Sequence, residues 1–401
     1  MLLLAACASP PEPKPQALAC PAPPEAPVCP APVTTPPVTP PPVVEQRGRL
    51  ERAAWSEIPD WGREGLRASL QAFVRSCAVL ERQEPWKAVC AGAQTMEGAP
   101  ERDIASFFEL NFDAHRVVNS DGTDTGLVTG YYEPLLHGSR TRTARYRYPL
   151  YGVPGDLLTI DLSSVYPDLK GRRLRGRLEG NRVVPYFSRG DIDRDDTPIR
   201  GSELVWVDDA VDAFFLHIQG SGQVEFDNGE RVRVGYADQN GYPFRSLGRV
   251  LIQRGELPPE RASMQGIKDW VRRNPSRAQE MLNTNPSYVF FRELSRDLPG
   301  PLGAQGVPLT PERSIAVDAR VVPLGVPVYL ATTWPNTSDP LNRLMVAQDT
   351  GGAIAGGVRA DFFWGFGDAA GSQAGKMRQQ GRMWVLLPKG YVPPPPDARA
   401  P

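Results

Sequence analysis

The protein has 401 residues and a formal net charge of −1 at pH 7, because 45 lysines and arginines face 46 aspartates and glutamates. A chain of this length can bury a sizeable core and is expected to hold two domains. Without an excess of basic residues there is no reason to expect a nucleic-acid partner. The histidines His115, His137 and His217 lack the spacing of zinc ligands, so we expect no metal site.

Residues 1–7 have the features of a remnant of a targeting signal. Leu4-Ala5-Ala6-Cys7 resembles the bacterial lipobox, in which the cysteine becomes the lipidated N-terminus, so Cys7 is the predicted lipidation site. A usual signal peptide has a basic start and a longer apolar stretch, and a chance match is therefore the alternative. Ala8 resembles the signal for outer-membrane sorting. We expect a periplasmic lipoprotein anchored to the outer membrane.

Residues 8–43 are rich in proline and nearly free of large side chains. Such a segment cannot form a core and is expected to be a disordered, extended spacer. Cys20 and Cys29 lie in it and have no assigned role. A spacer after a lipid anchor would let a folded body reach away from the membrane. The folded region is predicted to begin near Val43.

Cys77 and Cys90 flank Glu84-Pro85-Trp86 between two stretches with helical character. A disulfide between them would close a short loop, which in the chain-entropy model contributes about 3 kcal/mol. Two buried free thiols fit the spacing equally well. An oxidising compartment favours the bridge.

Apolar spacing predicts helices first and strands later. Helical patterns cover residues 50–82 and 101–112, and a β-like run covers 126–136. Residues 146–234 are interpreted as an all-β unit, with Asn228-Gly229 as a hairpin turn. The remaining predicted elements are helices over 245–253, 264–271, 278–283 and 371–379, strands over 287–291, 315–317, 326–332, 344–347 and 383–387, and a disordered tail after 389.

Asp349 follows a short apolar run at the point where a buried strand should end. Four glycines come next and permit positive φ or close approach of a ligand to the main chain. They are Gly351, Gly352, Gly356 and Gly357. The alternative is a glycine-rich turn in which the aspartate caps a loop.

Asp361 stands directly before the aromatic residues Phe362, Phe363 and Trp364. A carboxyl beside aromatic rings is prone to desolvation, which disfavours its charged form and lets it act as an acid near neutral pH. Two aspartates, a glycine-rich loop and an aromatic wall indicate a carbohydrate-cleaving site. The alternative is that the rings fill a core, and the residues alone leave both interpretations open.

Four sequence blocks resemble one known family, the membrane-bound lytic murein transglycosylase A family, along nearly all of the predicted folded length. The blocks are Thr129-Gly-Tyr-Tyr-Glu-Pro; Gln219-Gly-Ser-Gly with Tyr236-Ala-Asp-Gln-Asn-Gly and Arg245-Ser-Leu-Gly; Asn285-Pro-Ser-Tyr-Val-Phe-Phe; and a three-aspartate (3D) domain with Asp318, Asp349-Thr-Gly-Gly-Ala-Ile and Asp361. Any one block could arise by chance, whereas four in the family's order make the resemblance specific.

The resemblance implies a mainly β fold with peripheral helices. A six-stranded double-psi β-barrel would be built from residues 44–139 and 251–389, the latter holding the 3D domain. A second β domain would be inserted at 140–250, with the substrate groove between the two and a disordered tail at 390–401.

The resemblance also implies cleavage of the β-1,4 bond between N-acetylmuramic acid and N-acetylglucosamine in peptidoglycan, with 1,6-anhydromuramic ends and no cofactor. Ordinary glycosidases need two carboxyls, but here the substrate's own C6 hydroxyl is the nucleophile. Asp361 would be the single acid and base, and Asp349 a supporting catalytic residue. The alternatives are a hydrolytic muramidase and a non-catalytic glycan-binding module. Expected partners are peptidoglycan glycan strands, the outer membrane through the lipid anchor, and a cell-wall synthesis or hydrolysis complex.

Eleven residues are candidates for substrate binding, and each has a structural alternative. Tyrosines on a β run are often core, Gln219-Gly-Ser can be a tight turn, Asn240 and Arg245 can hold a domain junction, and Asp318 can cap a turn. The candidates are Thr129, Tyr131, Tyr132, Gln219, Gly220, Ser221, Asn240, Arg245, Asp318, Gly351 and Gly352.

Overall fold

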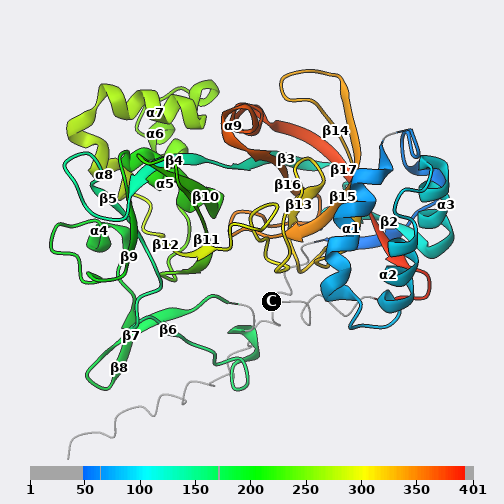
Figure 1. Cartoon of the computed structure of the whole chain (residues 1–401), viewed down its shortest axis with the longest axis horizontal. Helices are drawn as coiled ribbons and strands as arrows, with labels where there is room; N and C mark the ends of the chain where they lie inside the picture. Colours follow the sequence, from blue (N-terminus) through cyan, green and yellow to red (C-terminus); the bar gives the residue numbers. More distant parts are fainter. Residues whose placement is uncertain (1–47, 64, 170–171, 393–401) are drawn as a thin grey trace, which may run out of the picture. The chain divides into compact units, whose positions relative to one another are not determined.

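The computed structural model describes residues 48–63, 65–169 and 172–392. The predicted lipidation site Cys7, the spacer at 8–43 and most of the tail lie outside these residues. The described part is mainly β with helices, as expected (Figure 1). None of its helices combines the length and the apolar character needed to span a bilayer.

Six strands form a closed ring of pairings. The order is β17-β14-β15-β13-β16-β3, and β17 pairs back to β3, so the first and last strands meet. Two further strands, β1 (Arg49–Arg52) and β2 (Phe112–Val118), extend the sheet from β17. The ring strands are β3 (Gly126–Glu133), β13 (Ser314–Val317), β14 (Pro327–Thr333), β15 (Pro340–Asp349), β16 (Arg359–Phe366) and β17 (Arg378–Pro388).

Three helices pack on the outside of this sheet. α1 (Leu66–Leu80) buries an apolar face against β15, and the Ser69 hydroxyl donates to the Leu344 carbonyl at 2.6 Å. α2 spans Trp86–Thr95 and α3 spans Glu101–Asn111. The helix predicted over 50–82 is therefore too long. β1 and a 3-10 turn at Trp55–Glu57 occupy its first part, where apolar residues do not follow a helical period.

A disulfide joins Cys77 of α1 to Cys90 of α2, which confirms the predicted bridge. Both residues have no exposed surface and belong to the largest core cluster. The bridge therefore ties together two helices whose apolar faces already share one core.

A second, six-stranded sheet has the order β12-β11-β10-β4-β9-β5. The predicted hairpin at Asn228-Gly229 is confirmed, because it joins β10 to β11 with Gly229 at a φ of 81°. The strands are β4 (Leu135–Ser139), β5 (Tyr148–Tyr151), β9 (Glu203–Val207), β10 (Ser221–Phe226), β11 (Arg231–Gln239) and β12 (Val289–Leu294). The helices next to it in the chain are α5 (Ala210–Gln219), α6 (Leu247–Gln253), α7 (Met264–Arg273) and α8 (Ala278–Leu282).

The prediction of an all-β unit over 146–234 is wrong, because α5 and the short α4 (Arg189–Ile192) lie within it. The Asp209 side chain caps α5, and Gly220 ends it at a φ of 80°. Residues 213–217 are buried on all sides. A helix buried all round loses the apolar–polar period from which helices are recognised.

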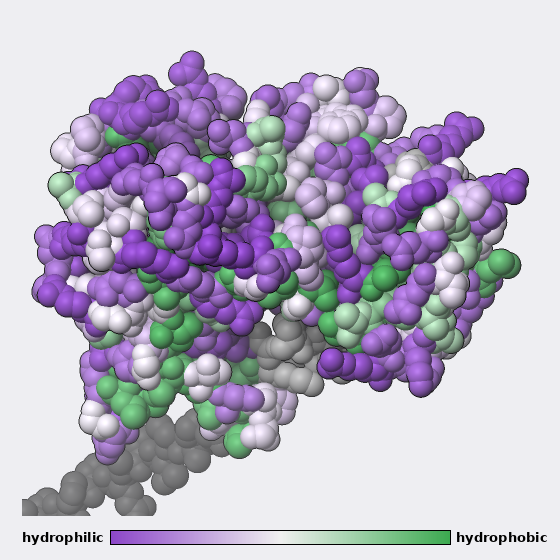
Figure 2. Space-filling view, viewed as in Figure 1, coloured by the Kyte–Doolittle hydropathy of each residue, from purple (hydrophilic) through white to green (hydrophobic). Residues whose placement is uncertain are grey.

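A third sheet is small and lies within the same segment. It pairs β6 (Leu158–Thr159), β7 (Arg175–Glu179) and β8 (Arg182–Pro185) in that order. Exposed large hydrophobic side chains are scattered over the otherwise hydrophilic surface (Figure 2), and Leu178 and Val183 of this sheet are among them.

The chain passes from the ring to the second sheet through one residue, Pro134, which separates β3 from β4. Glu133, at the end of β3, is 1% exposed. It accepts from Arg233 Nε at 2.7 Å and from Gln223 Nε2 at 3.1 Å, and both of these residues lie on the second sheet. Burial raises the pKa of Glu133 and the Arg233 cation opposes the rise. A buried ion pair thus fixes the point where the two sheets meet.

We expect the double variant Cys77→Ala/Cys90→Ala to unfold at lower denaturant concentration than the wild type. Loss of the loop constraint should lower the free energy of unfolding by about 3 kcal/mol. Urea unfolding followed by circular dichroism measures this. Dithiothreitol should lower the wild-type midpoint and leave the variant unchanged. Equal midpoints for wild type and variant without reductant would show that the bridge contributes nothing.

Candidate active site

Asp361 and Asp349 lie in one row across four neighbouring strands. Ala316 of β13 pairs with Asp349 on one side and with Asp361 on the other, and Asp361 pairs in turn with Thr129 of β3. Residues paired across a sheet project to the same face. Two strand spacings put the two aspartate backbones roughly 10 Å apart. The methyl side chain of Ala316 between them leaves room for their carboxyls.

Asp361 is held from the strand beside it. Thr129 Oγ1 donates to Asp361 Oδ1 at 2.6 Å, and Arg359 Nη2 donates to Thr129 Oγ1 at 2.9 Å. Burial raises the pKa of Asp361 to about 6, and the negative charge of Asp349 adds to the rise, against the Thr129 hydrogen bond and the Arg359 charge. The residue keeps some accessible surface. It is therefore a desolvated acid that a ligand can reach.

Asp349 ends β15, as the sequence predicted, and accepts three hydrogen bonds. Its Oδ1 accepts from the backbone N–H groups of Ala304 and Thr350, both at 2.9 Å, and its Oδ2 accepts from the Tyr131 hydroxyl at 3.1 Å. Burial raises the pKa of Asp349, while these donors oppose the rise because they favour the charged form. Asp349 is thus fixed on three sides.

Only one of the three aromatic residues after Asp361 shares its face of the strand. The sequence predicted an aromatic wall of three rings beside Asp361, but these residues lie on β16, where side chains alternate between faces. Phe363 therefore points with Asp361 and packs on Tyr131, with ring centroids 5.1 Å apart. Phe362 and Trp364 pack on each other in the hydrophobic core of the six-stranded ring. The expectation of a three-ring wall is wrong for this reason.

Tyr131 and Tyr132 are both interior, 7% and 9% exposed. The Tyr131 hydroxyl reaches Asp349, while the Tyr132 ring covers Gly371, where an added Cβ would come within 2.7 Å of it. Gly130, just before them in β3, also permits close packing, since a Cβ there would lie 2.7 Å from Trp364 Nε1. The placement of both rings fits the core alternative better than open stacking faces.

The Gln219-Gly-Ser segment is brought to the ring strand β3. Gln219 ends α5, and its Oε1 accepts from the backbone N–H of Tyr132 at 3.0 Å. Gly220 is the left-handed cap of the helix, and Ser221 begins β10. The segment therefore makes the turn foreseen as the alternative and also touches the strand that carries Thr129.

The remaining candidates support loops of the scaffold. Asn240 donates to the carbonyls of Phe187 and Pro286 and accepts from Tyr288 N–H at 2.9 Å. The Arg245 backbone N–H donates to Asn285, and its side chain is exposed.

Asp318 accepts from Arg320 at 2.7 Å and from Gly356 N–H at 2.9 Å. Burial alone would raise its pKa, but the bonds from Arg320 and Gly356 outweigh burial, so the pKa is lowered. Gly351 and Gly352 lie in the loop between β15 and β16, and Gly352 is open to solvent, with no atom within 4 Å of an added Cβ.

Sequence reasoning missed Arg359 and the Ala304 amide. Arg359 stands two residues before Asp361, and a strand would place both side chains on one face. A correct prediction of a strand over 359–366 would have identified Arg359 as a neighbour of Asp361. The Ala304 amide carries no side-chain signal, since it belongs to a loop far away in the sequence.

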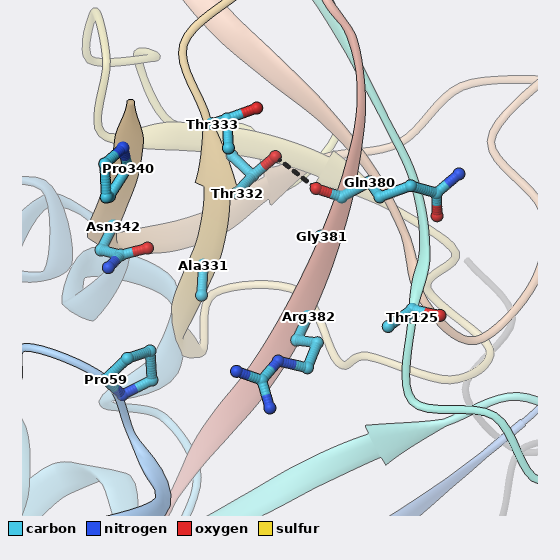
Figure 3. A pocket seen from close by; sticks show the side chains of 10 residues that line it. All are labelled: Pro59, Thr125, Ala331, Thr332, Thr333, Pro340, Asn342, Gln380, Gly381 and Arg382. Atoms are coloured by element: carbon cyan, nitrogen blue, oxygen red, sulfur yellow. Dashed lines mark hydrogen bonds between the residues drawn. The ribbon is translucent and has the colours of Figure 1, made fainter. Parts of the chain in front are cut away.

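A pocket lies on β14, β15 and β17 and contains neither aspartate (Figure 3). Its floor includes the hydrogen bond from Thr332 Oγ1 to the Gln380 carbonyl, at 2.7 Å. It offers no desolvated acid, so we place the chemistry at the aspartate row. Its lining residues are Pro59, Thr125, Ala331, Thr332, Thr333, Pro340, Asn342, Gln380, Gly381 and Arg382. Among the described residues, no group of three or more His, Cys, Asp or Glu side chains is placed to hold a metal ion.

Comparison with known proteins agrees with the resemblance in the sequence. Residues 127–292 match the family model "MltA specific insert domain", and residues 313–387 match the "3D domain". The chain is 32% identical to membrane-bound lytic murein transglycosylase A of Escherichia coli K12 over 292 residues, which are 71% of this chain and 72% of that protein.

Solved structures give the same result. The crystal structure of MltA from Neisseria gonorrhoeae matches with a TM-score of 0.74 and 40% identity, over 86% of this chain and 94% of that one. E. coli MltA with bound chitohexaose matches with a TM-score of 0.64 and 28% identity, over 86% and 95%. The chain belongs to the membrane-bound lytic murein transglycosylase A family.

Proposed function

We propose that this lytic murein transglycosylase cleaves the β-1,4 bond between N-acetylmuramic acid and N-acetylglucosamine with Asp361 as its single general acid and base. The observation that carries the proposal is the raised pKa of Asp361, about 6, on a side chain that remains accessible. A carboxyl with this pKa is in large part protonated in mildly acidic solution and can still act as a base once it has given up its proton.

The reaction balances without water. The protonated Asp361 gives its proton to the glycosidic oxygen, which takes the electron pair of the breaking bond to C1 of the muramic acid. The C6 hydroxyl oxygen of the same sugar then bonds to C1, and its proton passes to the ionised Asp361. The products are a 1,6-anhydromuramic end and a free N-acetylglucosamine hydroxyl. No second carboxyl is needed to activate water, unlike in hydrolytic glycosidases.

Asp349 is assigned a supporting role. Two backbone amides and the Tyr131 hydroxyl favour its charged form. A fixed negative charge on the same face as Asp361 stabilises the positive charge that develops at C1 in an oxocarbenium-like transition state. It also raises the pKa of Asp361 and so helps to keep the acid protonated.

The wider setting follows the family. The closed six-stranded ring supports a double-psi β-barrel, with an inserted β domain and the glycan strand in a groove between them. The inserted sheet runs from β4 to β12 and so extends beyond the predicted bounds of 140–250 at both ends. The Glu133–Arg233 ion pair and the Gln219–Tyr132 hydrogen bond join the ring strand β3 to the inserted segment. Thr129, Gln219 and neighbouring polar groups would contact the sugars. Anchoring to the outer membrane through Cys7 is part of the proposal, as is membership of a cell-wall enzyme complex.

Product analysis separates this function from its alternatives. Mass spectrometry of muropeptides released from purified peptidoglycan should find anhydromuramic ends. A muramidase would instead give reducing ends, whose mass is larger by one water, and a binding module would release nothing.

We expect Asp361→Asn to lower kcat by roughly 10²–10⁴-fold. The amide oxygen can still accept from Thr129, so the fold should persist. Since the substitution removes a buried acid that is costly to ionise at pH 7, the thermal midpoint at that pH should be no lower than that of the wild type. Release of soluble muropeptides and thermal unfolding measure the two effects. Near wild-type turnover would refute the assignment.

The matched control is Asp349→Asn, for which a smaller, partial loss is expected because this residue transfers no proton. Equal and complete loss at both positions would favour a two-carboxyl hydrolase.

The pH dependence should follow the acid form of Asp361. Because the group must start protonated and its pKa is about 6, kcat/KM is expected to fall above that pH, by about tenfold per unit. Initial rates at constant ionic strength from about pH 4 to about pH 8, roughly two units either side of the expected pKa, measure this decline in kcat/KM. Thermal unfolding over the same range controls for loss of fold. A rate that is flat up to pH 8 would contradict an acid at Asp361.

A further inference from the structure

Arg359 begins β16 and shares a face of the strand with Asp361, two residues later. The parallel pairing of β16 with β3 sets Arg359 opposite Leu127 and Asp361 opposite Thr129, and Figure 1 shows the two strands side by side. Thr129 is therefore placed to contact both charged side chains. Arg359 Nη2 donates to Thr129 Oγ1 at 2.9 Å, and Nη1 donates to the carbonyls of Ala360 and, at 3.4 Å, Leu127.

The direction of the two hydrogen bonds on Thr129 is fixed by chemistry. A guanidinium has donors and no acceptor, whereas a hydroxyl has one proton to give. Thr129 Oγ1 must therefore accept from Arg359. Its own proton is left for Asp361 Oδ1, 2.6 Å away. Without Arg359 the hydroxyl could rotate and accept from Asp361 instead.

We infer that Arg359 is a positioning residue that turns the Thr129 hydroxyl toward Asp361 Oδ1 and thereby leaves Oδ2 as the oxygen that carries the proton to the substrate. This rests on the proposed role of Asp361 as the general acid. In a neutral carboxyl the carbonyl oxygen is the better acceptor, so the oxygen that accepts from Thr129 is the carbonyl, and the proton sits on the other.

The step then has a defined geometry. The proton leaves Oδ2 for the glycosidic oxygen, and the electron pair of the O–H bond stays on Oδ2. The same oxygen later takes the proton of the C6 hydroxyl, so the carboxyl ends as it began. Thr129 keeps its proton throughout, because Arg359 occupies its acceptor side. The hydrogen bonds from Arg359 to Thr129 and from Thr129 to Asp361 thus orient the acid, and neither of them transfers a proton.

A double-mutant cycle tests whether Arg359 acts through Thr129. The enzymes compared are wild type, Thr129→Val, Arg359→Gln and the double variant, with Thr129→Ser as the variant that keeps the hydroxyl. kcat on purified peptidoglycan is measured over pH, and each protein is checked by thermal unfolding. If Arg359→Gln does not fold, Arg359→Met, of similar length, takes its place.

In the plot of kcat against pH, the fall on the alkaline side is called the alkaline limb. Thr129→Val should move this limb up by roughly one pH unit, because a hydrogen bond to the charged carboxylate is lost. It should also lower kcat on the acid side by about tenfold. Thr129→Ser should keep the limb in its wild-type position. Arg359→Gln should lower kcat to a similar extent in the wild-type background and add little to that loss in the Thr129→Val background.

Losses in kcat that simply multiply in the double variant would overturn the inference, since Arg359 would then act independently of Thr129. An Arg359→Gln enzyme with the kcat and the alkaline limb of the wild type would also overturn it. The proposed function is tested separately. If the Asp361→Asn enzyme remained active in the same assay, Asp361 would not be the general acid, whatever the double-mutant cycle shows.

Discussion

The parallel pairing of β3 with β16 is the contact on which the rest of the structure depends. It joins Thr129 to Asp361, which lie far apart in the sequence, and it completes the ring that begins with β17. The same pairing aligns Arg359 and Asp361 against Thr129. Because side chains on a strand alternate between faces, a shift of this register by one residue would turn Asp361 into the core and bring Phe362 to the face that Asp361 now occupies.

The site keeps a carboxyl partly desolvated, at some expense to stability. Burial raises the pKa of Asp361, so ionising the residue at neutral pH costs free energy in the folded protein. The surroundings limit that cost: Thr129 and Arg359 favour the charged form, while Asp349 disfavours it. The resulting pKa of about 6 lies between that of an ordinary aspartate and that of a fully buried acid. The proposed role of Asp361 as acid and then base depends on this intermediate value.

Much of the architecture was legible in the sequence, and what was missed has physical causes. Short strands in the last third and the Asn228-Gly229 hairpin follow local rules of period and turn chemistry. α5 was missed because five consecutive residues in it, 213–217, are buried and hide the apolar–polar period. β16 was missed because the glycines before it and the run of three aromatic residues in it conceal the alternation.

The site was predictable in part. Asp349 and Asp361 were recognised because glycine and aromatic neighbours mark carboxyls with unusual surroundings. Thr129 reaches Asp361 through strand pairing, and the Ala304 amide reaches Asp349 from a loop that is distant in the sequence. Arg359 is on the same strand as Asp361, but that strand was not predicted. Thr129 was named only through the resemblance to the family, and Arg359 was not named at all. Local sequence can thus mark a reactive group but not the groups that reach it from distant segments.

The ring of strands also has a consequence for when the enzyme can become active. β3 comes early in the chain, but its ring partners β16 and β17 are the last strands of the described residues. The intervening residues include the whole second sheet. The entropic cost of closing a loop grows only slowly with its length, so this long insertion does not prevent the pairing. A chain that is still emerging therefore has no closed ring and no assembled acid. Thr129 can meet Asp361 only once β16 has been made.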